Sequence, residues 1–339
     1  MRSVLDIQKQ LLPDLMDTMR KRYTILHHIM LSRVIGRRTL ASTLDMTERV
    51  LRSEIDFLKA QGLLEIESFG MRVSVSGEQL LQAIEPMVRE LFGLSELEDK
   101  LRARFGMDSA VVVPGDSDTS PFAKIELGRA GAAAVRKMAA KEGVVAVTGG
   151  STMAEVANHI SPTPQLKSSL FVPARGGLGE SVDFQANTIA STMAKKCGGQ
   201  YRLLHVPDHL GEEAYLSLIQ EPNIQEIIGV IGQTRMLVHG IGEASLMAKR
   251  RKIDSGTIEQ LKQEGAVAEA FGYYFDASGT MIHKMPTVGL KLEDIQKTEV
   301  VIAVAGGKSK ARSIAAVMRF GCDHVLVTDE AAALEMLES

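Results

Sequence analysis

The stretch from Val144 to Val156 constrains the fold of this chain more strongly than any other part of the sequence. Four consecutive small or β-branched apolar residues, Val144 to Val147, are typical of a buried strand. The glycine-containing segment Thr148 to Gly150 ends this run, and Ser151 and Thr152 stand where a helix would begin. Loop amides, the positive end of a helix dipole and two hydroxyl groups together suit an anion such as phosphate. A turn that joins a strand to a helix and binds nothing explains the same residues equally well.

The same arrangement recurs at two other places in the chain. Val300 to Ala305 is a second buried-strand run, followed by two glycines and Lys310. Leu170 to Pro173 is a shorter run, followed by Arg175 and three glycines. In open α/β sheets the ligand lies at the carboxyl ends of the strands, so we expect these loops to meet at one site. The sequence therefore predicts that Arg175 and Lys310 bind an anion.

Two nucleotide-binding motifs do not fit these loops. A P-loop places a glycine five residues before its Gly-Lys pair, but Ile302 stands five places before Gly307. The dinucleotide fingerprint comes nearest at Gly240 and Gly242, where Ser245 occupies the third glycine position. A small phosphorylated molecule is therefore a better candidate ligand than a nucleotide.

The composition is that of an ordinary globular protein of 339 residues, enough for roughly two domains. Cys197 and Cys322 form no C-x-x-C pair, which predicts reduced thiols in a cytoplasmic protein. No apolar run approaches the roughly 20 residues of a membrane helix, so we expect no membrane partner. His205 and His209 flank Pro207, which disfavours a helical metal pair. With no nucleophile elbow or metalloprotease motif either, we expect no catalytic residues, no metal and no cofactor.

Positive charge is concentrated near the N-terminus. The whole chain has a net charge of −3, whereas residues 20–53 contain eight Lys or Arg against two acids, a local balance of +6. Such a segment is typical of nucleic-acid-binding modules, and also of a solvated protein surface. The pattern of apolar residues beneath the charges decides between these interpretations.

This pattern predicts three helices and a hairpin. Arg22 to Ser32 and Thr39 to Leu44 are the first two expected helices, and a third runs from a Thr47 N-cap to about Gln61. Two short strand patterns, Leu64 to Ser68 and Met71 to Val75, follow. This order describes a winged helix-turn-helix, whose recognition helix enters the major groove of DNA. The residues predicted to contact DNA lie at the start and on the outer face of the third helix: Thr47, Glu48, Arg49, Arg52 and Ser53.

The rest of the chain predicts a second, larger α/β domain. From Ala110 onward strand and helix patterns alternate, which favours a mostly parallel, Rossmann-like sheet covered by helices. The expected domains are a winged-helix domain over residues 1–76, a helical connector over 77–106 and an effector-binding and oligomerisation domain over 107–339.

Two apolar stripes, one at the start of the first domain and one on the connector, have more than one interpretation. Leu5 to Met19 is an amphipathic pattern interrupted by Pro13, which would pair with a partner or pack on the first domain. Leu94, Leu97 and Leu101 stand at helical spacing on the connector. Such a stripe favours self-association, and it is equally typical of a first helix packed on the next domain.

Several long motifs in this order resemble the SorC-type bacterial transcriptional regulators over nearly the whole chain. They are LDMTERVLRSEIDFLKAQGLL, LEDKLRARFGMDSAVVVPG, VTGGSTMAEVA, VPARGGLGE, HGIGEASLMAKRR, GAVAEAFGYYFDASG and AVAGGKSKARSIAA. The resemblance implies that the second domain is similar to sugar-phosphate isomerases and deaminases and senses an effector. It further implies an operator ahead of glycolytic genes and fructose 1,6-bisphosphate as the inducer.

The resemblance also implies a set of effector ligands. Loop amides, hydroxyls and Lys310 would bind one phosphate, Arg175 and Arg250 the other, and Glu269 would accept from sugar hydroxyls. Arg250 lies within a basic run, residues 249–252, that is also typical of a solvated surface. The complete set is Gly149, Gly150, Ser151, Thr152, Arg175, Gly177, Leu178, Gln185, Arg250, Glu269 and Lys310.

Our expectation is an effector-controlled repressor, assembled as a dimer or tetramer and without catalysis. A sugar-phosphate enzyme with a DNA-binding appendage is the competing interpretation, but an isomerase needs a positioned acid/base pair and Glu269 alone does not establish one. A DNA-bound scaffold without a ligand is a third.

Overall fold

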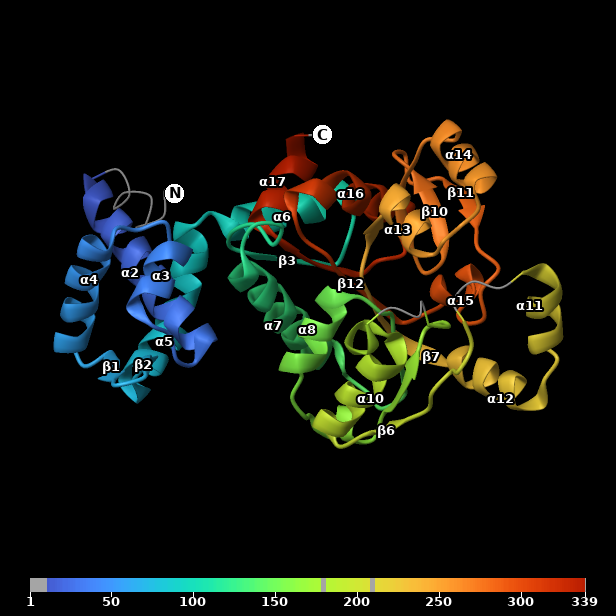
Figure 1. Ribbon diagram of the computed structural model, residues 1–339, viewed down its shortest axis with the longest axis horizontal. Coiled ribbons are helices and arrows are strands. Elements are labelled where there is room, and N and C mark those ends of the chain that lie inside the picture. The colour runs from blue at the N-terminus through green and yellow to red at the C-terminus, as the bar shows by residue number, and fades with distance from the viewer. Residues whose placement is uncertain (1–10, 178–180, 208–210, 339) are drawn as a thin grey trace. The chain divides into compact units, whose positions relative to one another are not determined.

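The chain divides into two compact units, which we call unit 1 (Met1–Glu96) and unit 2 (Leu97–Ser339). Figure 1 shows the computed structural model, which describes residues 11–177, 181–207 and 211–338. The division differs from the expected boundaries, because the helix that follows the hairpin belongs to unit 1. Arg20 donates a hydrogen bond to the carbonyl of Leu91 at 3.2 Å and its guanidinium lies over the Phe92 ring at 4.6 Å. The expected connector 77–106 is thus divided between the two units.

Unit 1 consists of four described helices, a two-stranded sheet and the beginning of a fifth helix. These elements are α2 (Pro13–Ser32), α3 (Arg37–Thr43), α4 (Glu48–Ala60), β1 (Leu64–Glu67), β2 (Gly70–Val73), α5 (Val75–Leu91) and α6 (Leu94–Phe105), which extends into unit 2. The first helix begins at Pro13 and not at Arg22, because proline is tolerated in the first turn of a helix. The expected pattern from Leu5 onward falls partly on residues 1–10, which lie outside the described residues.

The third predicted helix is present as α4. The Thr47 hydroxyl accepts a hydrogen bond from the Val50 amide at 3.3 Å and so caps its N-terminus. Leu51, Ile55 and Leu58 are buried on the stripe that the sequence predicts. Replacing one of these leucines by alanine would cost about 2–5 kcal/mol, so the stripe fixes which face of α4 points outward.

Unit 2 is built on a seven-stranded parallel sheet. In spatial order its strands are β3 (Ser109–Val113), β13 (Val325–Asp329), β12 (Val300–Val304), β7 (Thr234–His239), β4 (Val144–Val147), β5 (Leu170–Pro173) and β6 (Gln200–Tyr201). This sheet confirms the parallel α/β domain predicted from the alternating patterns.

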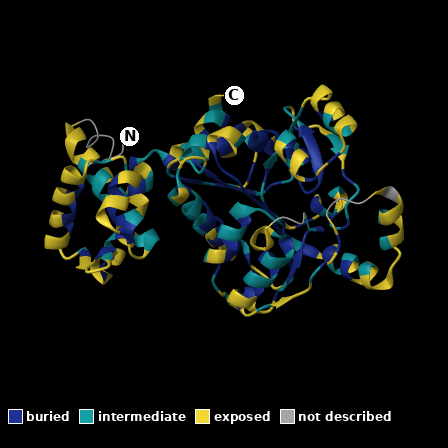
Figure 2. Cartoon of the chain, in the orientation of Figure 1, coloured by how far each residue is buried: buried dark blue, intermediate teal, exposed yellow. Residues whose placement is uncertain are grey.

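Helices α7 (Pro121–Met138), α8 (Ser151–His159) and α10 (Ala186–Cys197) pack beside one another on this sheet. Leu127, Met153 and Ile189 from these helices share one hydrophobic core with strand residues such as Val147. A Cβ on Gly128 of α7 would lie 2.5 Å from the Cβ of Glu155, so α7 and α8 approach closely. Figure 2 shows the central strands dark blue, as expected for a sheet buried on both faces, whereas both residues of the edge strand β6 are exposed.

A second, antiparallel sheet in unit 2 was not anticipated. It consists of β11 (Met281–Lys284), β10 (Tyr273–Asp276), β9 (Ala266–Ala270) and β8 (Gly242–Glu243). Helices α13 (Ala244–Arg250) and α14 (Ser255–Gln263) pack with β9, and Tyr274 is buried in their shared core. The alternating strand and helix patterns predict a parallel sheet, and they do not indicate that these strands, of two to five residues, pair antiparallel in a sheet of their own.

The remaining described elements of unit 2 are short helices and the two helices that end the chain. They are α9 (Pro164–Lys167), η1 (Val182–Phe184), α11 (Glu212–Leu218), α12 (Pro222–Ile231), α15 (Leu292–Ile295), η2 (Lys308–Lys310), α16 (Ala311–Phe320) and α17 (Glu330–Glu338). Among the described residues, no helix combines the length and apolar character that crossing a membrane requires.

Candidate functional site

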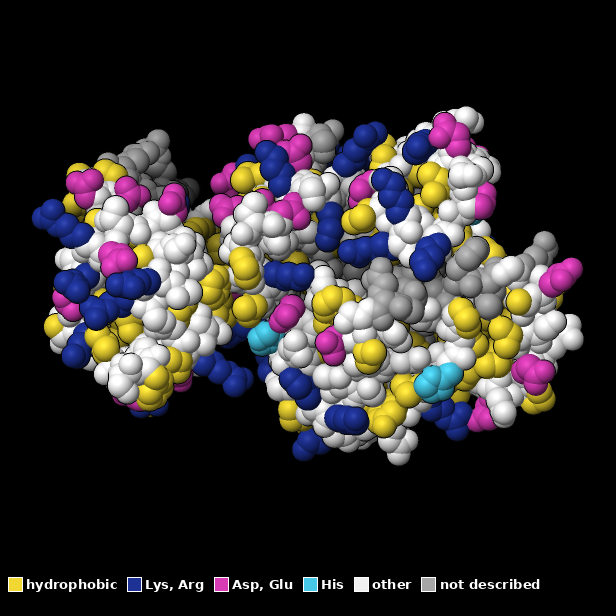
Figure 3. All heavy atoms as spheres, in the orientation of Figure 1, with side chains coloured by type: hydrophobic (Ala, Val, Ile, Leu, Met, Phe, Trp, Pro, Cys, Tyr) yellow, Lys and Arg dark blue, Asp and Glu magenta, His cyan; other side chains and the backbone are white. Residues whose placement is uncertain are grey.

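The outer face of α4 is a candidate DNA-binding surface. All five residues predicted to contact DNA, from Thr47 to Ser53, are exposed. Figure 3 shows Lys and Arg side chains gathered over α4 and α3 on this face of unit 1. In the part of the chain that the structure describes, Arg49 and Arg52 form no ion pair, whereas Arg38 lies 3.8 Å from Glu48. Guanidinium groups without an internal counter-ion suit phosphate or guanine.

The hairpin of unit 1 carries a different charge pattern. Arg72 on β2 lies 2.6 Å from Glu65 and 3.1 Å from Glu67, both on β1. Two acids opposite one base leave the hairpin without excess positive charge. The charge that would attract DNA phosphate is therefore on α3 and α4 and not on these strands.

A buried carboxylate, which the sequence did not indicate, fixes α4 against α2. Glu54 is 8% exposed and lies 2.7 Å from Lys21 Nζ and 2.8 Å from Arg22 Nε. Arg22 also lies over the Phe57 ring at 3.6 Å. Burial raises the pKa of Glu54, but hydrogen bonds and charges from Lys21 and Arg22 outweigh burial and hold the pKa below its ordinary value.

The predicted effector ligands of unit 2 lie around one cavity. It opens at the carboxyl ends of β4 and β7, where the strand order of the sheet reverses, as expected for open α/β sheets. Leu178 lies outside the described residues. The other predicted ligands that line the cavity are Gly149, Gly150, Ser151, Thr152, Arg175, Gly177, Gln185, Arg250, Glu269 and Lys310.

The loop after β4 has the geometry of an anion site. Gly150 adopts φ +119°, a value that L side chains rarely adopt, and stands at the N-cap of α8. The first amides of α8 have no partner within the helix and face the cavity with the Ser151 and Thr152 hydroxyls. Lys124, which the sequence analysis missed, donates to Ser151 Oγ at 2.8 Å.

The loop after β12 differs from the expected second anion site. Its amides already donate to carboxylates of the chain: Gly307 to Asp329 at 2.7 Å, and Ser309 to Asp118 at 2.8 Å. A Cβ on Gly307 would lie 2.3 Å from Asp118 Oδ1, so glycine is needed for this approach. The amides of this loop are therefore paired within the chain, and among the described residues of the loop only Lys310, the one predicted to bind an anion, lines the cavity.

The surroundings of Lys310 change its protonation. Burial lowers its pKa below the ordinary value of 10.5, and the positive charges of Lys124 and Arg250 lower it further. Asp118 and Asp329 oppose this shift. A bound phosphate would favour the charged lysine, so ligand binding and protonation of Lys310 are linked.

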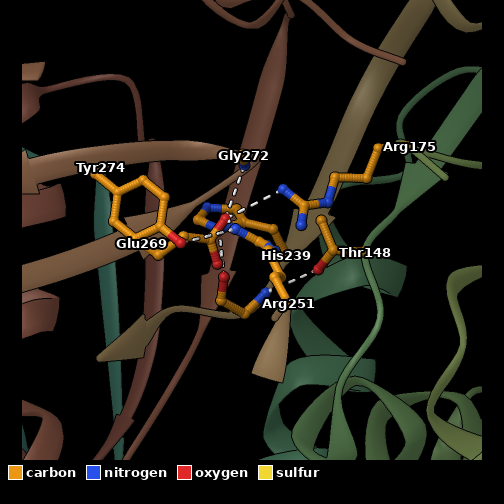
Figure 4. A network of polar contacts seen from close by, with 8 residues as sticks. Thr148, Arg175, His239, Arg251, Glu269, Gly272 and Tyr274 are labelled. Carbon is orange, nitrogen blue, oxygen red and sulfur yellow. Dashed lines mark hydrogen bonds and ion pairs between the residues drawn. The ribbon is translucent and has the colours of Figure 1, made fainter. Parts of the chain in front are cut away.

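Three charged side chains that line the cavity meet one another. Arg175 Nη1 lies 3.1 Å from Glu269 Oε1, and Arg251 Nη2 lies 2.8 Å from the same oxygen. All three residues are buried, and Figure 4 shows the two guanidinium groups and the Gly272 amide converging on Glu269. The sequence named Arg250, which is exposed, but did not single out Arg251. Both lie in one basic run, and their difference in burial depends on where α13 ends.

A tight turn between β9 and β10 positions this group. Phe271 and Gly272 both have positive φ, 55° and 91°, as in the type I′ turns of two-residue hairpins. Arg175 Nη1 lies 2.8 Å from where a Cβ of residue 272 would be, so a side chain there would displace the guanidinium. The Phe271 ring lines the cavity and packs on His239 with ring centroids 4.2 Å apart.

The fully buried His239, which lies behind Phe271, makes two polar contacts of its own. Its Nε2 lies 2.6 Å from Asp323 Oδ1, and its Nδ1 lies 3.1 Å from the carbonyl oxygen of Gly240. Among residues 11–177, 181–207 and 211–338, no group of three or more His, Cys, Asp or Glu is placed to hold a metal ion.

The leucine stripe on α6 is not an exposed surface. Leu94 and Leu101 are buried, at 2% and 0% exposure, whereas Leu97 is partly exposed. Arg104 of α6 donates to the carbonyl of Leu337, and Glu98 accepts from the Val112 amide. The burial of Leu101 and the contacts of Glu98 and Arg104 favour the alternative interpretation, in which this part of α6 packs within unit 2.

Two family models match the two parts of the chain. The N-terminal DNA-binding domain of CggR matches residues 18–88, and a domain described as sugar-binding matches residues 89–338. The chain is 49% identical to the central glycolytic genes regulator of Priestia megaterium and 47% identical to that of Bacillus subtilis. Each of these matches covers 99% of both chains.

Solved structures agree with this relationship. A SorC family transcriptional regulator from Enterococcus faecalis is 43% identical, with a TM-score of 0.67 over 71% of this chain and 99% of that chain. The full-length sorbitol operon regulator SorC from Klebsiella pneumoniae has a TM-score of 0.65 over 95% of this chain and 99% of that chain; at 16% identity it shows likeness of fold. The chain therefore belongs to the SorC family of bacterial transcriptional regulators, in the group of the central glycolytic genes regulators.

Proposed function

We propose that the protein represses glycolytic genes by binding operator DNA through unit 1, and that fructose 1,6-bisphosphate bound in the cavity of unit 2 is its inducer. The observation that carries the proposal is the convergence of the α8 N-terminus, Lys310 and Arg175 on one cavity that also contains Glu269. The full-length similarity to two central glycolytic genes regulators supports the choice of target genes.

The chemistry of the cavity supports a sugar with two phosphates. One phosphate would accept hydrogen bonds from the α8 amides, from Ser151 and Thr152, and from Lys310. The second would bind Arg175, with Arg250 at the rim. Glu269 would accept hydrogen bonds from the sugar hydroxyls between them.

The proposal assigns neither a catalytic step nor a cofactor to this cavity. Turnover of sugar phosphates by the purified protein would contradict the absence of a catalytic step. We also propose a homo-oligomer, a dimer or tetramer, because two symmetric recognition helices match two half-sites on DNA. A monomer in sedimentation experiments, both alone and on operator DNA, would rule this out.

Calorimetry on the full chain tests the ligand. Fructose 1,6-bisphosphate should bind more tightly than fructose 1-phosphate or fructose 6-phosphate, since each monophosphate leaves one end of the cavity unfilled. Arg175→Ala and Lys310→Ala should each weaken binding by about tenfold or more. Lys308→Ala is the matched control, because Lys308 is exposed and paired with Glu335 at 3.5 Å. Equal affinities for the three sugars would contradict the two-phosphate site.

Fluorescence anisotropy with labelled DNA from ahead of the glycolytic genes tests the response. Fructose 1,6-bisphosphate should lower the affinity for that DNA, because an inducer must prefer the state that binds DNA weakly. By linkage, DNA should weaken ligand binding by the same factor. An unchanged DNA affinity at saturating ligand would contradict the inducer assignment and leave the binding site intact.

A further inference from the structure

The two carboxylate oxygens of Glu269 have different surroundings. Oε1 lies 3.1 Å from Arg175 Nη1 and 2.8 Å from Arg251 Nη2, and it accepts a hydrogen bond from the Gly272 amide at 2.8 Å. In the part of the chain that the structure describes, no side chain or amide donates a hydrogen bond to Oε2, and Oε2 is not one of the buried atoms that lack a partner. Because Glu269 lines the cavity, one oxygen is held by the protein and the other is open to a ligand.

Arg251 contacts side chains on two neighbouring strands, Glu269 on β9 and Tyr274 on β10. It is 6% exposed, follows the last residue of α13, and directs Nη1 toward the Tyr274 hydroxyl at 3.5 Å. Tyr274 on β10 is the cross-strand partner of Glu269 on β9. A single guanidinium thus contacts both members of one cross-strand pair, which restricts the side-chain rotamers that Glu269 can adopt.

The Oε2 atom of Glu269 would discriminate between ligands by the hydrogen bonds that they can donate. An ionised carboxylate only accepts hydrogen bonds, so Oε2 favours O–H donors and repels phosphate oxygens. A ligand whose central part carries hydroxyl groups satisfies Oε2, whereas one with a hydrocarbon centre leaves it without a partner. Burying an unsatisfied polar group costs free energy, and sites built to bind a hydroxyl reject ligands that lack one.

We propose that Arg251 is a positioning residue that fixes Glu269 so that its Oε2 selects bisphosphates with a hydroxyl-bearing centre. The inference rests on the proposed function, since it takes the cavity to bind a bisphosphate. It differs from a ligand role for the basic run around α13, in which Arg251 would itself bind phosphate. Arg250, the neighbouring residue, is exposed at the rim of the cavity and provides the comparison.

The test measures a selectivity ratio by calorimetry on the full chain. The two ligands are fructose 1,6-bisphosphate and hexane-1,6-diol bisphosphate, which keeps both phosphates and lacks the hydroxyls. The wild-type protein should prefer the sugar, and Glu269→Gln and Arg251→Met should each reduce this preference by about tenfold. The double variant should lose no more than either single variant, because both remove the same interaction. Arg251→Lys, which retains the charge, should restore part of the preference.

Arg250→Met is the matched control. It should leave the ratio unchanged, because a phosphate ligand at the rim affects both compounds alike. Melting curves check folding, and if Arg251→Met is unfolded, Glu269→Gln and Arg251→Lys decide the question. An Arg251→Met protein that binds both compounds more weakly by the same factor would overturn the proposal, as would an unchanged ratio in Glu269→Gln.

The affinities of the wild-type protein separate the selection by Glu269 from the proposed effector. If the wild-type protein binds both bisphosphates with equal affinity, the selection by Glu269 is wrong while the two-phosphate site remains. If it binds neither compound, the proposed effector itself is wrong, and the inference fails with it.

Discussion

Glu54 shows how one side chain can fix the orientation of a recognition helix. Its two basic partners on α2 hold α4 by charge-assisted hydrogen bonds. Glu54→Gln should lower the free energy of unfolding by roughly 1.5–3 kcal/mol, as measured by urea denaturation at neutral pH. Glu65→Gln on the exposed hairpin should change it by less than about 0.5 kcal/mol.

The pH dependence of this contribution has a definite sign. The pKa of Glu54 in the folded chain lies below its ordinary value of 4.5. The stabilisation is therefore complete above about pH 4.5 and is lost as the pH falls through the lowered value. Wild-type protein should lose more stability than Glu54→Gln over that acidic range. Parallel losses in the two proteins would contradict the ionised pair.

Phosphate binding through Lys310 should have a pH dependence of the opposite sign. Because burial lowers its pKa below 10.5, Lys310 loses its charge at a lower pH than an exposed lysine. The contribution of Lys310 to phosphate binding is complete below its lowered pKa and is lost as the pH rises through it. Calorimetry from about pH 7 to about pH 10 should show wild-type affinity falling before that of Lys310→Arg, whose guanidinium stays charged. Lys308→Arg should follow the wild-type curve.

Single residues also show where prediction from the sequence ends. Arg175 and Lys310 could be named because each lies beside glycines in a loop that follows a strand. Arg251 and Lys124 could not, because no periodic pattern separates a buried arginine from its exposed neighbour, or tells which lysine of a long helix reaches the next helix. Those placements depend on where α13 ends and on the close approach of α7 to α8 at Gly128.

Among the elements of unit 1, α4 is the helix predicted to contact operator DNA. Arg52→Ala should weaken operator binding by about 1–3 kcal/mol if it contacts a base, and should lower the salt dependence if it contacts phosphate. Arg72→Ala on the hairpin should have little effect, because Arg72 is already paired with two glutamates. Anisotropy titrations at several salt concentrations measure both. If neither Arg49→Ala nor Arg52→Ala changed affinity or salt dependence, α4 would not be the recognition helix.

The elements that the sequence predicted carry local signals. Helix α4 begins at the Thr47 cap, and the four-residue strand β4 is marked by its apolar run and the glycines that follow it. The pairing of strands is not a local signal, and the alternating patterns of unit 2 predict a parallel sheet without indicating the separate antiparallel one. Two of the acids that pair with the loop after β12, Asp116 and Asp118, come from a segment nearly two hundred positions earlier in the sequence.

For the whole molecule, the division into two units predicts that unit 2 folds alone. The Enterococcus faecalis structure is matched over 99% of its own chain while covering 71% of this one. A fragment from Leu94 to Ser339 contains all of unit 2 and the whole of α6. Because no element of unit 2 is interrupted, the fragment should unfold cooperatively. Ligand at about one hundred times its dissociation constant adds about 2.7 kcal/mol, which raises Tm by roughly 5–10 °C. A non-cooperative transition in scanning calorimetry would show that unit 2 requires unit 1.

The aspartates that occupy the glycine loop after β12 bear on how the ligand range of this molecule could evolve. Each amide of this loop has its own acceptor: Asp329 for Gly307, Asp116 for Lys308 and Asp118 for Ser309. One substitution at any of these aspartates would therefore uncover one backbone donor, while the glycines and the turn stay in place. A wider range of anions could thus be reached one amide at a time, without rebuilding the loop.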